Sequence, residues 1–209
     1  IYQNRRGVSA ARNLGLELMI GDYFCFLDAD DVMPSNGLRD RIRIFAKQPD
    51  LSFVDGTVVY FDESMTRLIK KYVPSFEGYP YDELLRLNRA CYFGNTWMIK
   101  RDNDVKYQFI DGMTHAEDLY FYISISKGKK YSYTSEEVLY YRVTDQSAMS
   151  NLEGLEKGYK ILYNKIKSDQ RPNYSVLINL RLKLKKIMFL SYICDGKMPI
   201  KALKALLSL

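Results

Sequence analysis

The sequence predicts one α/β domain followed by a shorter, all-helical extension. Helical and strand-like patterns alternate along the first 150 residues, an order typical of a sheet with helices packed on its faces. A continuous apolar run at 23–27 ends abruptly in three aspartates among four residues, so charge gathers at the end of a predicted strand. Beyond residue 151 the pattern is helical throughout. We therefore expect two parts, residues 1–150 and residues 151–209.

The first third of the chain predicts a helix, a strand and a second helix. Apolar residues at helical spacing follow Ser9, which is a good N-cap. The run at 23–27 shows no polar alternation, as expected of a strand covered on both faces. Spacings of three and four then predict a helix over 38–47. Two strands, at 51–54 and 57–61, complete a βαβ arrangement.

The remaining elements of the first part are shorter. Pro80 favours a helix start, because its fixed φ suits the first turn. Gly128 is placed to end another helix, since glycine tolerates the left-handed conformation at a helix C-terminus. In order, the predicted elements are a helix over 81–87, a strand over 97–99, a helix over 116–126 and strands over 131–134 and 138–142.

Composition limits the class of protein. With 209 residues, 47% of them hydrophobic, the chain can bury a core, which excludes an intrinsically disordered protein. Three widely spaced cysteines fit neither a disulfide framework nor a CxxC metal site. Their number and spacing indicate a reducing compartment, so we expect a cytoplasmic location. No run approaches the roughly 20 apolar residues that a membrane-spanning helix needs.

Charge is distributed unevenly along the chain. Residues 151–209 contain 12 Lys or Arg and 4 Asp or Glu, a balance of +8 within a net charge of +6, so the rest carries −2. A basic helical segment can lie on an anionic membrane surface, or it can pack with its lysines facing solvent. We expect peripheral contact with the inner face of the cell membrane through 151–209, and no nucleic acid as a partner.

The aspartates within residues 28–31 allow three kinds of site to be considered. Carboxylates crowded at a strand end repel one another unless a cation or a ligand offsets their charge. Hard oxygen ligands of this kind suit Mg²⁺ or Mn²⁺ bridging to phosphate oxygens. A calcium loop of the EF-hand type is excluded, because Val32, Met33 and Arg39 stand at positions five, six and twelve. A phosphohydrolase of the haloacid dehalogenase type and a nucleotide-sugar transferase both remain.

Flanking residues favour the transferase. Residues 4–15 (NRRGVSAARNLG), followed by Gly21 and the aspartates, resemble the inverting glycosyltransferases of family 2. That family has the GT-A fold, a Rossmann-like mixed sheet. Residues 114–118 (THAED) are similar to its Glu-Asp motif at a helix start, and 140–142 (YYR) followed by Ser147 resemble the stretch after its last strands. A dehalogenase-type enzyme would need a later acidic motif with glycines, which is not obvious here.

For the donor, the resemblance implies four binding residues besides the Glu-Asp motif. Asp28 would contact the nucleotide side of the sugar donor, and Asp30 would bind the metal, Mn²⁺ or Mg²⁺, that bridges its diphosphate. Arg12 would lie beside the nucleotide, where a guanidinium suits phosphate or a base edge. Arg142 could reach diphosphate oxygens. For both arginines a structural alternative stays open, because Arg12 could pair with a carboxylate and Arg142 could tie down a loop.

For the acceptor, the resemblance implies that Asp118 is the general base. This carboxylate would remove the proton of the attacking hydroxyl, and the neighbouring Glu117, also assigned to the donor site, could help to raise its pKa. A single displacement of this kind inverts the anomeric carbon. The structural alternative for an Asp at a helix start is capping.

The resemblance implies a GT-A transferase that moves a sugar from a nucleoside diphosphate donor, with UDP as the expected nucleotide. The acceptor would be a glycan or a lipid-linked sugar of bacterial surface polysaccharide. The match covers 4–150 and begins inside the family's fold, so we expect an N-terminally truncated chain that lacks two βα units, on the order of 60 residues. The alternatives are a dehalogenase-type phosphohydrolase and a non-catalytic, truncated binding module.

Overall fold

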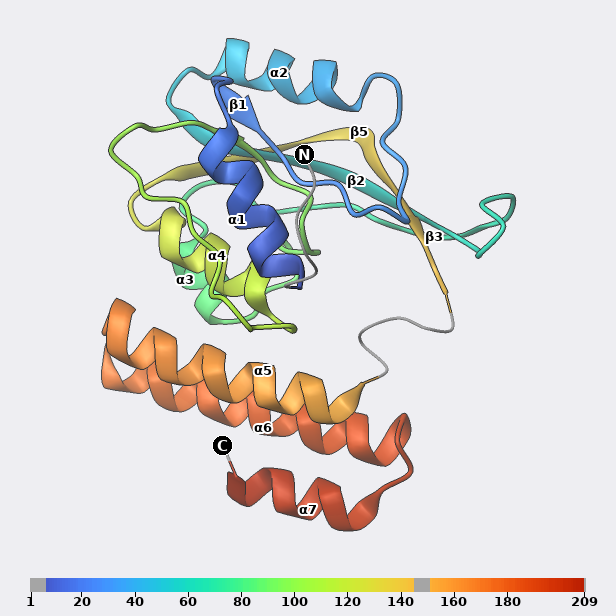
Figure 1. The fold of residues 1–209 in the computed structure, drawn as a ribbon, viewed down its shortest axis with the longest axis vertical. Coiled ribbons are helices and arrows are strands. Elements are labelled where there is room, and N and C mark those ends of the chain that lie inside the picture. Colours follow the sequence, from blue (N-terminus) through green and yellow to red (C-terminus); the bar gives the residue numbers. More distant parts are fainter. Residues whose placement is uncertain (1–6, 145–150, 209) are drawn as a thin grey trace. The chain divides into compact units, whose positions relative to one another are not determined.

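The computed structural model describes residues 7–144 and 151–208 (Figure 1). Residues 4–6 and Ser147, which carried part of the resemblance, lie outside the described residues. Packing divides the described residues into two compact units. The sheet unit comprises residues 14–108 and 125–144, and the helix unit comprises residues 7–13, 109–124 and 151–208. The predicted boundary at 151 follows sequence character instead, and the first C-terminal helix begins just after it.

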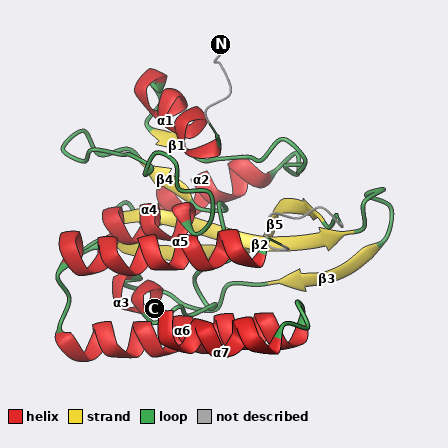
Figure 2. Cartoon of the chain, turned by 60° about the horizontal axis from the view of Figure 1, so that its bottom comes forward, coloured by secondary structure: helices red, strands yellow, loops and turns green. Residues whose placement is uncertain are grey.

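The sheet unit is built on a mixed sheet of five strands centred on β2 (Leu51–Phe61). The strand β5 (Lys130–Arg142) runs parallel to β2 and pairs with it along its whole length, as Figures 1 and 2 show. The strands β4 (Met98–Lys100) and β3 (Leu68–Tyr72) pair antiparallel with successive parts of β2. The edge strand β1 (Tyr23–Phe24) pairs antiparallel with β4 and is therefore parallel to β2.

The predicted βαβ arrangement is present, with β4 inserted between its two strands. Residues of β2 are buried almost without interruption because neighbours pair with both of its edges and side chains cover both of its faces. The helix α2 (Gly37–Lys47) covers one of these faces through Phe45, which packs with Leu51, Val54 and Met98 in one apolar cluster. The short helix α3 (Tyr81–Leu85) buries Leu84 and Leu85. The predicted pairs of strands at 51–61 and 131–142 each form one strand.

The prediction of a strand covered on both faces over 23–27 is wrong. Only Tyr23 and Phe24 pair, because β1 has a single neighbour and the chain then leaves the sheet. Leu27 is 47% exposed. The acidic residues therefore follow an extended loop rather than the end of a central strand.

The helix unit holds the first turns of α1 (Val8–Leu18), most of α4 (Glu117–Ser126) and the C-terminal helices. Ser9 is not the N-cap of α1, as predicted, but lies inside it, buried, and donates to the carbonyl oxygen of Met113 at 2.8 Å. The C-terminal helices are α5 (Leu152–Lys165), a π-helical turn (Ile166–Gln170), α6 (Tyr174–Cys194) and α7 (Pro199–Ser208).

The C-terminal helices pack through apolar stripes. The buried face of α6 carries residues at spacings of three and four: Leu177, Leu180, Leu184, Met188 and Tyr192. Figure 2 shows α6 and α7 side by side, and α7 buries Ala202 and Ala205. Within residues 7–144 and 151–208, no helix is long and apolar enough to cross a membrane.

A carboxyl group is buried in the middle of β2. Asp55 is wholly buried and accepts hydrogen bonds from the backbone N–H of Gly56 at 2.8 Å and from the hydroxyl of Tyr131 at 3.2 Å. Burial raises the pKa of Asp55 to about 6, against the opposing effect of these hydrogen bonds and of the Arg41 charge. The core of the sheet unit therefore contains a group that titrates near neutral pH.

Candidate active site

The acidic segment, Asp28 to Asp31, is a turn fastened to the end of β5. The N–H of Asp31 donates to the carbonyl of Asp28 at 3.1 Å and closes the turn. The next residue, Val32, exchanges two backbone hydrogen bonds with Tyr140, at 3.0 and 2.8 Å. A loop held in this way presents its side chains in a fixed direction although it belongs to no strand.

Arg142 is the second fastening of the acidic segment. Its backbone N–H donates to a carboxylate oxygen of Asp31 at 2.9 Å, and its Nε donates to the carbonyl of Asp30 at 2.8 Å. A third bond runs from Nη1 to the carbonyl of Glu63 at 2.5 Å. The structure therefore places Arg142 beside the segment, where it ties down the loop. Its contact with a donor diphosphate stays a prediction.

The three carboxylates differ in exposure. Asp28 and Asp30 are exposed, whereas Asp31 is half-buried. Burial raises the pKa of Asp31 to about 6, against the hydrogen bond from Arg142, and the charges of Asp30 and Asp28 raise it further. The segment thus concentrates negative charge that a bound cation would offset.

Asp28 and Asp30 fit a metal that a substrate helps to hold. Among residues 7–144 and 151–208, no group of three or more His, Cys, Asp or Glu side chains is arranged to bind a metal ion by itself. Mg²⁺ is commonly held by one or two carboxylates together with water and the phosphates of a substrate, not by a cage of protein ligands. Two exposed carboxylates on a fixed turn match that donor set.

The predicted base lies in the first turn of α4, in the helix unit. Asp118 is half-buried, and its Oδ1 accepts from the backbone N–H of Leu119 at 2.7 Å. Negative charge at this end of a helix is stabilised by the helix dipole. Burial, and then the charge of Asp118, raise the pKa of Tyr159 on α5. Tyr159, which belongs to no motif in the sequence, therefore lies in the surroundings of Asp118.

Arg12 and Glu117, both predicted to bind the donor, form an ion pair. Arg12 Nη1 lies 2.9 Å from Glu117 Oε1, and the two side chains are 9% and 11% exposed. The Arg12 guanidinium also lies over the ring of Phe109, 5.3 Å from its centroid. Arg12 therefore does pair with a carboxylate, which is the structural alternative predicted for it. This ion pair joins α1 to the start of α4. Donor contacts of either residue stay predictions.

The predicted residues therefore form two groups. Asp28, Asp30 and Arg142 come together in the sheet unit, and Arg12, Glu117 and Asp118 come together in the helix unit. The sequence indicated that Arg142 could tie down a loop and that Arg12 could pair with a carboxylate, but not which atoms these side chains contact. The bonds from Arg142 to backbone carbonyls leave no motif, because any residue supplies a carbonyl.

Comparison with known proteins gives three findings. A family model described as "Glycosyl transferase family 2" matches residues 1–107. A protein of Haemophilus influenzae described as an uncharacterized glycosyltransferase is 29% identical over 148 residues, which are 70% of this chain and 56% of that protein. The crystal structure of S. aureus TarS 1–349 in complex with UDP-GlcNAc has a TM-score of 0.62 and 15% identity, covering 93% of this chain and 55% of that one.

A second structure of S. aureus TarS gives the same picture of the fold. It has a TM-score of 0.56 at 16% identity and covers 92% of this chain and 32% of its own. The predicted GT-A-type α/β fold is confirmed by these likenesses. The chain spans about half the length of the curated relative and of TarS 1–349.

Proposed function

We propose that this chain, which belongs to glycosyl transferase family 2, supplies the diphosphate-binding and base residues of an inverting glycosyltransferase. The observation that carries the proposal is the acidic segment, a fixed turn that exposes Asp28 and Asp30 while Arg142 and β5 hold its backbone. A UDP-sugar is the proposed donor, because the TarS structure of the same fold was solved with UDP-GlcNAc.

At the donor end, the proposal assigns charge neutralisation to the acidic segment. Bound there through Asp30, Mn²⁺ or Mg²⁺ would act as a Lewis acid on the diphosphate. Asp28 contacts the nucleotide side of the donor. Arg142 keeps the carbonyl of Asp30, and with it the turn, in place. Fixed groups of this kind stabilise charge without rearranging during the reaction.

At the acceptor end, Asp118 takes the proton from the attacking hydroxyl. Asp118 lies in the first turn of α4 and is only half-buried, so an acceptor hydroxyl can reach its carboxylate. The acceptor is a glycan or a lipid-linked sugar of surface polysaccharide. Membership of the family sets the phosphohydrolase alternative aside, and a non-catalytic binding module is separated from the enzyme by experiment.

The proposal predicts that the sugar donor binds only together with a divalent metal, and a binding measurement tests this. We expect UDP-GlcNAc with Mn²⁺ to raise the melting temperature, because a ligand at about 100 times its Kd stabilises the folded state by about 2.7 kcal/mol. EDTA and the variant Asp30→Ala should both abolish the shift, which differential scanning fluorimetry measures. Asp104→Ala, which removes an exposed carboxylate elsewhere in the sheet unit, is the matched control and should keep the shift.

Release of UDP in the presence of acceptor distinguishes an enzyme from a binding module. The chain spans 56% of its curated relative, and release of UDP is measured with this chain in the presence and absence of acceptor. A melting shift that survives both EDTA and Asp30→Ala would show that the acidic segment does not bind the donor metal.

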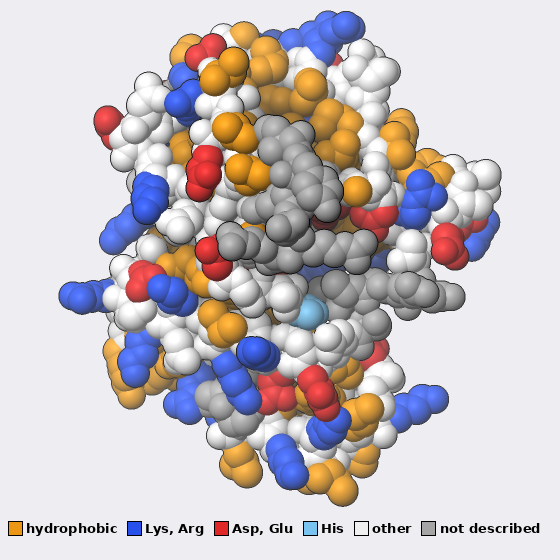
Figure 3. All heavy atoms as spheres, in the orientation of Figure 1, with side chains coloured by type: hydrophobic (Ala, Val, Ile, Leu, Met, Phe, Trp, Pro, Cys, Tyr) orange, Lys and Arg blue, Asp and Glu red, His pale blue; other side chains and the backbone are white. Residues whose placement is uncertain are grey.

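Membrane contact through 151–209 is part of the proposal, and α7 is its best-supported element. Ile200, Leu203 and Leu207 follow one another on one side of α7 and are 69%, 61% and 85% exposed. Lys201 and Lys204 lie along the same helix. Figure 3 shows Lys and Arg side chains, together with some Asp and Glu, among apolar ones over the C-terminal helices. Apolar residues edged by lysines suit the interface of an anionic bilayer.

Vesicle sedimentation tests this contact. We expect the protein to sediment with vesicles containing phosphatidylglycerol and to stay in solution with phosphatidylcholine alone, because each lysine near an anionic surface contributes about 1 kcal/mol. Leu203→Glu should weaken binding several-fold. Leu38→Glu, at an exposed leucine of α2, is the matched control. Equal binding to both kinds of vesicle, or no binding to either, would contradict the proposal.

A further inference from the structure

The helix α5 approaches the residues before Asp118 closely at two of its glycines, where an added Cβ would force His115 to shift. A Cβ added to Gly158 would lie 2.5 Å from the carbonyl oxygen of His115 and 2.8 Å from its Cβ. A Cβ added to Gly154, one turn earlier, would lie 2.5 Å from Cε1 of the His115 ring. Real Cβ contacts of this length are not found. The two glycines therefore form a seat for His115.

His115 fills that seat. It is 7% exposed, and its Nδ1 lies 3.0 Å from the hydroxyl of Thr114. The backbone on one side and the ring on the other are thus both in contact with α5. Because the packing around His115 is close, this residue cannot change position unless α5 or the residues after His115 also move.

The chain that follows is strained. Ala116 has a φ of 57°, in the left-handed region, where an L-residue other than glycine costs about 1–2 kcal/mol. Such a conformation persists only where its surroundings hold it. Its carbonyl accepts from the N–H of Tyr120 at 3.1 Å, so the strained residue is also the first acceptor of α4. The contact between α5 and His115 lies one residue before Ala116, where it can hold the Ala116 backbone in this left-handed conformation.

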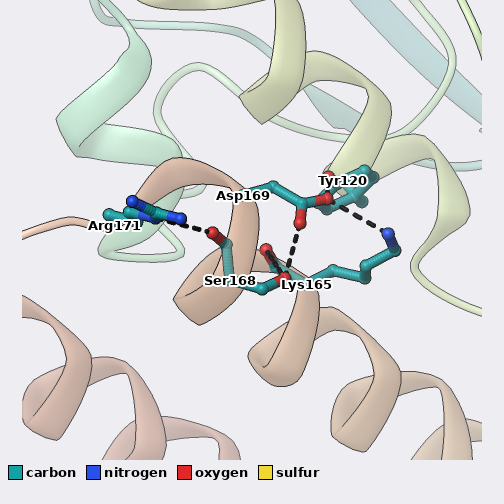
Figure 4. Close-up of polar contacts among 5 residues, drawn as sticks. All are labelled: Tyr120, Lys165, Ser168, Asp169 and Arg171. Atoms are coloured by element: carbon teal, nitrogen blue, oxygen red, sulfur yellow. Dashed lines mark hydrogen bonds and ion pairs between the residues drawn. The ribbon is translucent and has the colours of Figure 1, made fainter.

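A side-chain hydrogen bond also joins α4 to the end of α5. The Tyr120 hydroxyl donates to Oδ2 of Asp169 at 2.6 Å, in the π-helical turn that continues α5 (Figure 4). Hydrogen bonds from Ser168 and then Tyr120 lower the pKa of Asp169 to about 2, so this carboxylate is ionised throughout the physiological range. The start of α4 is therefore fastened to α5 on both sides of Asp118.

We infer that Gly154, Gly158 and His115 are positioning residues for Asp118. By seating His115, α5 sets the backbone at Ala116, and Ala116 sets the direction in which the first turn of α4 presents the carboxylate. The inference rests on the proposed role of Asp118 as the base. It makes α5, which sequence character assigns to a C-terminal extension, part of the machinery that aims the catalytic group.

Replacement of Gly158 by Ala tests the inference by a split between kcat and KM. We expect kcat to fall at least about 10-fold with the donor KM within about twofold of wild type, since misplacement of a reacting group by about 1 Å can cost about 100-fold. Gly15→Ala is the matched control, because Gly15 is also inside a helix and a Cβ there meets nothing within 4 Å. That variant should keep kcat. If Gly158→Ala prevents folding, Gly154→Ala takes its place, because its added Cβ meets side-chain atoms instead of backbone.

A readout independent of activity separates this inference from the proposed function. The chain has one histidine, so its imidazole Hε1 gives a single NMR resonance. Gly154→Ala and Gly158→Ala should displace that resonance, and Gly15→Ala should not. A displaced resonance with unchanged kcat overturns the positioning role while the seat stands. An unmoved resonance overturns the seat itself. Absence of transfer by the wild-type protein is a failure of the proposed function and is seen before any variant is compared.

Discussion

Replacement of Asp118 by Asn is expected to lower kcat for sugar transfer by at least about 100-fold, the smaller end of what a general base contributes. The amide keeps the shape of the side chain and can still accept from the N–H of Leu119, so α4 should keep its start. It cannot take a proton from the acceptor hydroxyl. Because Asp28 and Asp30, which the proposal assigns to the donor and its metal, lie in the acidic segment, the donor KM should stay within about twofold of wild type.

Steady-state kinetics across pH measure this effect. In the wild-type protein the acidic limb of the kcat profile reports titration of the base, and this limb should disappear from the residual activity of Asp118→Asn. Asp195→Asn, at an exposed carboxylate that ends α6, is the control and should behave as wild type. An Asn variant with more than a tenth of the wild-type kcat would assign Asp118 to helix capping, the structural alternative.

The buried Asp55 should make stability depend on pH in a direction opposite to that of a salt-bridged aspartate. Burial raises its pKa to about 6 in the folded protein from the ordinary value of 3.8, so the folded state binds the proton more tightly than the unfolded state. The stabilisation from this proton is full below about pH 4 and is lost as pH rises through about 6. The shift corresponds to about 3 kcal/mol in the free energy of unfolding.

Urea denaturation of the wild type and of Asp55→Asn, between pH 4 and pH 7, isolates this contribution. An asparagine can accept the hydrogen bond from the N–H of Gly56 through its one side-chain oxygen, and its amide NH2 can donate to the Tyr131 hydroxyl in place of the bond that Asp55 accepts. It does not ionise. The difference in free energy of unfolding between the two proteins should therefore shift by about 2 kcal/mol in favour of the variant as pH rises over this range, the larger part of the full effect. Two curves that stay parallel over this range would mean that Asp55 titrates alike in both states.

Much of the fold could be predicted because local patterns act within a few residues. The predicted helices at 38–47 and 116–126 match α2 and α4 to within one residue. The strand over 23–27 was the main error. Its apolar run looks like a central strand, but how long a strand pairs depends on its neighbours, and β1 has only β4.

For the candidate site, the sequence by itself determined which residues carry charge and where. Residue type and spacing identified three candidate carboxylates, Asp28, Asp30 and Asp118. This was possible because a carboxylate carries its chemistry in its own side chain, which the sequence states directly. What holds them was decided only by tertiary structure. Arg142 bonds to the carbonyl of Asp30 across 112 positions, and Gly158 contacts His115 from a distant helix. Such contacts use backbone atoms and empty space, which every sequence contains and no motif records.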